Sequence, residues 1–148
     1  MTTPLIDLAY KIALKAHKEQ SDMGGNPYIG HLTRVASKFN REEFIVTALL
    51  HDILEDTSIT EYELLSYGIP GNIVETIKLL TRKQGVTYRD YIKSLQYNKT
   101  AIEVKLSDLE DNMNLERLNS ITKQDIDRVN KRYRPAYEFL SSKLLDYN

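Results

Sequence analysis

Apolar positions recur at helical spacing along most of the chain. Leu5, Leu8, Ile12 and Ala16 lie three or four residues apart, and this spacing predicts an amphipathic first helix. No segment alternates apolar and polar residues for long, so we expect no extended strand. Residues 21–30 carry three glycines and a proline, which is typical of a loop.

Three later helices are expected to begin with the same capping signature. Thr60, Thr87 and Thr122 each stand where an N-cap hydroxyl accepts a hydrogen bond from an unsatisfied backbone N–H. An acidic residue follows each threonine by three positions, as in a capping box. Pro135 lies within the last helical pattern and predicts a kink there. The pattern predicts an all-α fold of seven or eight helices, the later ones at about 31–39, 42–55, 60–67, 72–81, 88–96, 99–113 and 123–145.

Length and composition narrow the class of protein. The chain has 148 residues, which fits one domain, and its 20 Lys and Arg against 21 Asp and Glu give a net charge of −1. This balance disfavours a broadly basic nucleic-acid binder, and the lack of cysteine excludes disulfides, thiolate metal sites and cysteine nucleophiles. Asp7 and Lys11 interrupt the N-terminal apolar stretch, so it does not read as a signal peptide. No apolar run reaches the roughly 18 residues of a membrane span, so we expect a cytoplasmic protein without membrane partners.

A histidine and three carboxylates lie close together in the apolar segment ALLHDILEDT. On a helix, His51 and Glu55 are four residues apart, as are Asp52 and Asp56, so each pair is stacked on one face. Four ionisable groups at a core-facing helix end are costly when unpaired, and a bound cation would turn their repulsion into ligation. The alternative interpretation is a solvated helix end with a hydrogen-bonded core histidine.

A second polar face accompanies an apolar stripe in the segment AIEVKLSDLEDNMNL. Lys105, Asp108 and Asn112 are spaced three and four apart, and Asp108 borders the core. His31 closes the glycine-rich loop, whereas His17, on the first helix, is expected to be a structural hydrogen-bonding residue. Two imidazoles and two carboxylates from three helices suit manganese, iron, zinc or magnesium, and the absence of thiolates argues against a closed structural zinc site.

These residues carry a resemblance to a known family. The order of His31, His51-Asp52 and Asp108 resembles the H…HD…D signature of HD metallo-phosphohydrolases. Four segments are more closely similar to the hydrolase domain of RelA/SpoT proteins, and most of all to stand-alone small alarmone hydrolases of the metazoan SpoT homologue type. They are AHxxQ (16–20), GNPYIGH (25–31), ALLHDILEDT (48–57) and VKLSDLEDNM (104–113).

The resemblance implies an HD hydrolase domain over residues 1–148, with no synthetase domain. Its implied activity is removal of the 3′-pyrophosphate from ppGpp and pppGpp, typically with Mn²⁺, to return GDP and GTP. Glu55 and Asp56 would orient and activate the attacking water. The implied metal ligands are His31, His51, Asp52 and Asp108. The substrate contacts that the resemblance implies are Lys105, Asn112, Tyr133, Arg82 and Lys83, and Tyr28 is a further candidate for lining the pocket.

Three positions depart from the family pattern. Asp22 stands where relatives usually carry an Arg or Lys that stacks on the purine, Leu109 where many have an arginine, and Leu32 where a proline often follows the first ligand. A second hypothesis is therefore an HD phosphohydrolase acting on ppApp, the NADPH 2′-phosphate or a nucleoside monophosphate. A third is a non-catalytic nucleotide-binding module, against which the Glu55-Asp56 pair argues.

Overall fold

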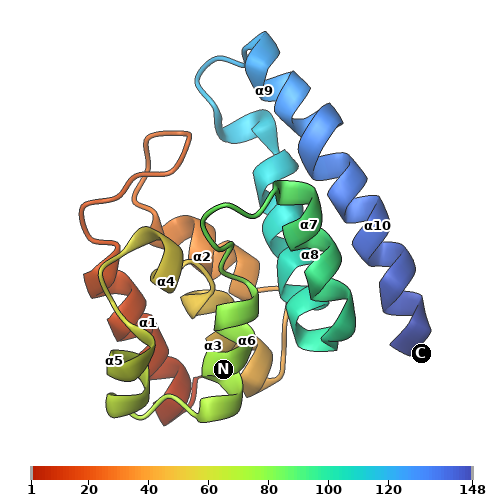
Figure 1. The fold of residues 1–148 in the computed structure, drawn as a ribbon. Coiled ribbons are helices and arrows are strands. Elements are labelled where there is room, and N and C mark those ends of the chain that lie inside the picture. Colours follow the sequence, from red (N-terminus) through yellow and green to blue (C-terminus); the bar gives the residue numbers. More distant parts are fainter. Residues whose placement is uncertain (1, 148) are drawn as a thin grey trace.

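The structure, a computed structural model, describes residues 2–147 and is built almost entirely from helices (Figure 1). Within these residues the only β-type pairing is an isolated bridge between Ser21 and Pro27, so the predicted all-α class is confirmed. The α-helices are α1 (Pro4–Ala16), α2 (Ile29–Ala36), α3 (Glu42–Leu50), α4 (Ile53–Asp56), α5 (Glu61–Ser66), α6 (Gly71–Leu79), α7 (Tyr88–Ser94), α8 (Lys99–Met113), α9 (Lys123–Arg128) and α10 (Arg134–Leu144).

The number of helices agrees with the prediction once two continuations are recognised. Among residues 2–147 there are ten α-helical segments; α4 resumes α3 after a break, and α9 runs into α10 as one rod, which leaves eight (Figure 1). Helix α8 has the predicted bounds, whereas α2 begins two residues before His31 and ends at Ala36 rather than at Phe39. Short 3₁₀ turns follow α7, α8 and α10, at Leu95–Tyr97, Leu115–Arg117 and Leu145–Tyr147.

Helix α3 lies at the centre of the fold. It contacts α1, α2, α6 and α8. A helix surrounded on several sides must be apolar around most of its circumference, and α3 meets this requirement. Helix α2 in turn packs on both α3 and α8, so the helices that carry His31 and Asp108 contact each other and the helix that ends just before His51 and Asp52. The buried residues of α3 are Phe44, Val46, Thr47, Ala48, Leu49 and Leu50.

The continuous helix predicted over 42–55 is wrong, because the backbone turns at His51 and Asp52. Helix α3 ends at Leu50, and α4 begins at Ile53. The carbonyl of Ala48 accepts a hydrogen bond from the His51 ring at 2.6 Å and a longer one from the His51 backbone N–H at 3.5 Å. An α-helix would instead direct this carbonyl to the N–H four residues later. The break therefore lies at the predicted metal ligands themselves.

The predicted helix caps are present. Thr60 and Thr122 form complete capping boxes with Glu63 and Asp125, and the Thr87 hydroxyl accepts a hydrogen bond from the backbone N–H three residues on. These motifs depend only on residues within one turn, which is why the sequence is sufficient to place them.

The irregularity predicted at Pro135 takes the form of a π-helical turn over Val129–Tyr133, just before the proline. The N–H of Arg134 bonds to the carbonyl of Val129, five residues back, instead of four. A proline in an α-helix crowds the carbonyl four residues before it, so a wider turn at this place relieves the crowding. Figure 1 shows α9 and α10 as one long rod beside α7 and α8.

A search of residues 2–147 for a helix of the length and apolarity that a bilayer crossing needs finds none.

Candidate metal centre and catalytic pocket

Four predicted metal ligands meet at one point between α2, α3 and α8. His31, His51, Asp52 and Asp108 each place one nitrogen or oxygen within 4.8 Å of the others. His31 Nε2 lies 2.9 Å from Asp108 Oδ1, and His51 Nε2 lies 3.3 Å from the same oxygen and 3.2 Å from Asp52 Oδ2. Both histidines and Asp108 are buried. Two imidazole nitrogens and two carboxylates around one buried point are a donor set that fits a divalent cation.

Both histidines are oriented by a bond from the other ring nitrogen. His51 Nδ1 donates to the carbonyl of Ala48 at 2.6 Å, and His31 Nδ1 lies 2.6 Å from Asp111 Oδ2. A backbone carbonyl can only accept, and a carboxylate beside two arginines is ionised, so both Nδ1 atoms carry a proton. The Nε2 atoms therefore face the centre of the cluster, as a metal requires.

Asp111 was missed by the sequence analysis. Its carboxylate accepts from Arg34 Nε at 2.8 Å and from Arg117 Nη2 at 3.2 Å, in addition to its bond with His31. Burial alone would raise the pKa of Asp111, but the hydrogen bonds and positive charges of His31 and Arg34 outweigh it and lower the pKa to about 2. In sequence Asp111 is one acid among several, and its partner His31 is 80 residues away, so no local signal marks it.

Ion pairing between protonated imidazole rings and carboxylates dominates the electrostatics of the cluster. Burial opposes a charge on His31, yet hydrogen bonds to Asp108 and Asp111 raise its pKa to about 9. For His51, burial is likewise overcome by Asp52 and Asp108, which hold its pKa well above the usual value. Conversely, Lys105 and the two histidines outweigh burial and hold the pKa of Asp108 well below its usual value.

The carboxylate oxygens of the predicted ligands Asp52 and Asp108 are bonded further by residues around them. Lys105 Nζ donates to Asp108 Oδ2 at 2.8 Å, and Asn112 Nδ2 lies 3.3 Å from Asp108 Oδ1. The Tyr28 hydroxyl donates to Asp52 Oδ2 at 2.5 Å. The three residues thus restrain the two carboxylates in the positions that ligation needs.

The cluster opens into a pocket of about 530 Å³. All eight remaining predicted site residues line it, together with Asp52 and Asp108, while His31 and His51 lie behind the carboxylates. Tyr88, Tyr91 and Arg132 also line the pocket, although no pattern in the sequence predicted this. The eight are Tyr28, Glu55, Asp56, Arg82, Lys83, Lys105, Asn112 and Tyr133.

The acidic pair lies at the mouth of this pocket. Asp52, Glu55 and Asp56 form a second cluster of carboxylates. Partial burial together with the neighbouring charges of Asp52 and Glu55 raises the pKa of Asp56 to about 6. Glu55 Oε1 accepts from the backbone N–H of Arg82 at 2.9 Å, which ties the loop after α6 to the acidic pair. The pair thus combines a carboxylate with raised proton affinity and one that anchors a basic loop.

The chain is similar in sequence to curated proteins of the RelA/SpoT type. No protein-family model matches the chain. It is 34% identical over 120 residues to the guanosine-3′,5′-bis(diphosphate) 3′-pyrophosphohydrolase of Aquifex aeolicus, covering 73% of this chain and 17% of that protein. It is 30% identical over 148 positions to the GTP pyrophosphokinase rsh of Brucella melitensis, covering 90% of this chain and 19% of that protein. The chain thus spans less than a fifth of the length of these curated relatives.

A solved structure has a similar fold. The structure of a metazoan orthologue of SpoT, described as hydrolysing ppGpp, superposes with a TM-score of 0.75 over 99% of this chain and 94% of that one, at 20% identity. The chain is a relative of the RelA/SpoT proteins. The resemblance found in its sequence is confirmed by both comparisons.

In this RelA/SpoT relative, Asp22 has a role within its own loop. Asp22 Oδ1 accepts from the backbone N–H groups of Gly24 and Asn26, both at 2.9 Å. Asp22 Oδ2 lies 3.6 Å from Arg34 Nη2. The aspartate therefore organises the turn of loop 21–30, and its carboxylate pairs with Arg34.

His17 is bonded as the sequence analysis expected of a structural residue. Gln20 Nε2 donates to the backbone carbonyl of Asp56 at 2.8 Å, so Gln20 Oε1 is free to accept from His17 Nδ1, also at 2.8 Å. The buried His17 thus supports α4 through Gln20.

Proposed function

We propose that this protein hydrolyses the 3′-pyrophosphate of guanosine alarmones, converting ppGpp and pppGpp to GDP and GTP, with Mn²⁺ as its metal. The observation that carries the proposal is the convergence of His31, His51, Asp52 and Asp108 at the base of a pocket whose mouth holds Glu55 and Asp56. The names of the Aquifex relative and of the metazoan structure support the same substrate.

The metal would be held by the two Nε2 atoms and by the carboxylates of Asp52 and Asp108. The mixed nitrogen and oxygen donors suit Mn²⁺, Fe²⁺ or Zn²⁺ better than a closed all-oxygen site would. When bound, such an ion supplies Lewis-acid activation of a water and of a phosphate oxygen. Lys105 holds the carboxylate of Asp108 through Oδ2, and Asn112 holds it through Oδ1, the oxygen that also faces the two histidines.

Side chains at the mouth of the pocket would accept the proton of the water, orient the water and offset the charge of the diphosphate. Asp56, with a pKa raised to about 6, is suited to accept the proton of the attacking water near neutral pH. Glu55, the residue next to Asp56 in sequence, orients that water and fixes the loop that carries Arg82. Arg82, Lys83 and Lys105 present positive charge to the diphosphate as the ribose 3′-oxygen departs.

The test is product analysis of Mn²⁺-loaded protein with ppGpp, pppGpp, ppApp and NADPH, with Asp52→Ala as the matched control. We expect GDP and pyrophosphate from ppGpp with wild type, and no turnover with Asp52→Ala. Metal-dependent turnover of another substrate with ppGpp left intact would refute the alarmone assignment and keep the metal chemistry.

A second candidate is hydrolysis of a different nucleotide, such as ppApp, the NADPH 2′-phosphate or a nucleoside monophosphate. The position of Asp22 favours it, because a carboxylate engaged in its own loop cannot stack on a guanine as an arginine would. A clear preference for ppGpp in the same assay would exclude this candidate.

A further inference from the structure

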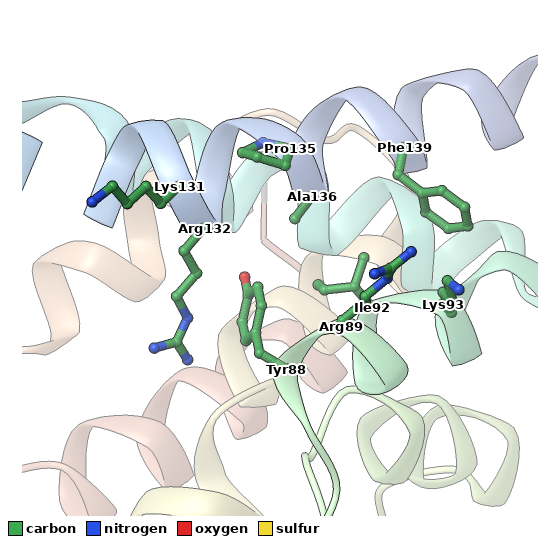
Figure 2. Close-up of a pocket in the computed structure, with 9 residues that line it drawn as sticks. All are labelled: Tyr88, Arg89, Ile92, Lys93, Lys131, Arg132, Pro135, Ala136 and Phe139. Carbon is green, nitrogen blue, oxygen red and sulfur yellow. The ribbon is translucent and has the colours of Figure 1, made fainter. Parts of the chain in front are cut away.

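A second hollow lies directly beside the catalytic pocket, between α7 and the rod formed by α9 and α10. Its volume is about 550 Å³, close to the 530 Å³ of the catalytic pocket. Tyr88 and Arg132 line both hollows. Figure 2 shows α7 below and the rod above; Arg132, Ala136 and Phe139 project from the rod toward α7, whereas Lys131 extends along the rod. We call this hollow the α7–α10 groove, defined by Arg89 and Lys93 on one side and Lys131 and Arg132 on the other.

The groove concentrates positive charge that no carboxylate neutralises. The residues of 2–147 that line it include four cations and no acid. Within that part of the chain none of the four takes part in an ion pair; the basic residues that do are Arg34, Lys38, Lys78, Lys105, Arg117 and Arg128, none of which lines the groove. Because the whole chain carries a net charge of −1, this local excess is a property of the groove and not of the protein surface in general.

The floor of the groove is apolar and partly aromatic. Ile92 and Ala136 are buried beneath it, and Pro135 and Phe139 complete the wall on the side of α10 (Figure 2). At the end next to the catalytic pocket, the guanidinium carbon of Arg132 lies 4.1 Å from the centre of the Tyr88 ring. A flat ring can pack on such a floor, and phosphates can bind the cations at its rim.

We propose that the α7–α10 groove binds a second nucleotide, a nucleoside di- or triphosphate, with its base on the apolar floor and its phosphates among the four cations. Ligand pockets of about 300–1,000 Å³ each hold one molecule of this size, so the catalytic pocket and the groove have room for one each. The Tyr88–Arg132 contact forms the boundary between them. Occupation of the groove therefore fixes two side chains of the catalytic pocket.

The test is direct binding of GTP and ATP to the full chain in metal-free buffer at fixed ionic strength, by calorimetry. The variant is Arg89→Gln/Lys93→Gln, which leaves the catalytic pocket untouched. The control is Lys11→Gln/Lys15→Gln on α1, which removes the same charge from another exposed surface. We expect the groove variant to bind nucleotide at least about tenfold more weakly than wild type, since hydrogen bonds to charged groups are among the strongest. The control should bind as wild type does.

The base is tested separately from the phosphates. Inorganic tripolyphosphate should bind more weakly than GTP, and Phe139→Ala should reduce this difference. The proposal would be overturned if wild type bound no nucleotide, or if the groove variant bound nucleotide as tightly as wild type. It would also be overturned if the α1 control lost as much affinity as the groove variant, or if tripolyphosphate bound as tightly as GTP. Since the readout is binding and not hydrolysis, these outcomes are distinct from a failure of the proposed enzymatic activity.

Discussion

Replacing Asp111 by alanine should weaken metal binding although Asp111 does not itself face the cluster. His31 Nδ1 would lose its partner at 2.6 Å, and the imidazole could then turn or place its proton on Nε2, the nitrogen that faces Asp108 at 2.9 Å. Loss of such a partner typically lowers metal affinity by about 10- to 100-fold. We expect a loss in this range for Mn²⁺ with Asp111→Ala.

The same substitution should also destabilise the metal-free fold. The side chain of Asp111 is only 9% exposed, whereas those of Arg34 and Arg117 are 37% and 29% exposed and can be rehydrated when the carboxylate is removed. The main cost is then the unsatisfied Nδ1 of the buried His31, on the order of 1–3 kcal/mol. Asp111→Asn should recover part of both losses, because its amide oxygen can still accept from His31.

The assay is a Mn²⁺ titration by calorimetry, together with thermal unfolding with and without the metal. Glu110→Ala is the matched control, because Glu110 is the adjacent carboxylate of α8 and bonds outward to Lys38 at 2.9 Å and Tyr137 at 2.8 Å. If Asp111→Ala bound Mn²⁺ as tightly as wild type, or if Glu110→Ala lost as much affinity, the orienting role of Asp111 would be refuted.

Three further predictions concern Asp108 with the acidic pair, the pKa of Asp56, and the helix cap at Thr60. Asp108→Ala should abolish Mn²⁺ binding and the rise in Tm on adding Mn²⁺. Glu55→Gln should retain both and lower kcat by about 100-fold or more. Equal loss of Mn²⁺ binding in the two variants would contradict the proposed roles. The pKa of Asp56 is about 6 in the fold against a usual 3.8, so its ionisation destabilises the fold as pH rises through this window. Asp56→Asn should therefore stabilise the metal-free protein by about 1 kcal/mol at pH 7, after allowance for solvent screening, and should not stabilise it at pH 3. The free energy of unfolding is measured by denaturant titration at both pH values, and equal stabilisation at the two would contradict this cause. Thr60→Ala should cost about 1 kcal/mol in the same titrations and Thr60→Ser little, whereas equal stability of all three proteins would argue against the cap.

The features that could be predicted from sequence are those whose determinants lie close together along the chain. The caps at Thr60, Thr87 and Thr122 need only residues within one turn, and each helix begins where its cap predicts. The four ligand positions were inferred from the chemistry of their side chains and from motif order, and the structure brings them together.

The features that could not be predicted depend on contacts between distant segments. The break after α3 arises because the His51 ring bonds to the carbonyl of Ala48, an alternative to the helical bond that apolar periodicity does not reveal. The bonds of Asp111 to His31 and of Tyr28 to Asp52 span 80 and 24 residues. Helical periodicity identifies the face on which such residues lie, but not their partners across the fold.

The π-helical turn at Val129–Tyr133 makes the length of this segment matter as much as its residue identities. The turn holds one residue more than an α-helical turn would, and each residue of an α-helix advances the side chains by about 100°. Deleting a single residue there would remove the wide turn and swing every side chain of α9 around the axis relative to α10, at the cost of restoring the crowding by Pro135. Insertion or loss of one residue is thus a one-step route by which descendants of this chain can redirect the side chains at the pocket wall, among them Arg132 and Tyr133, without altering the metal ligands.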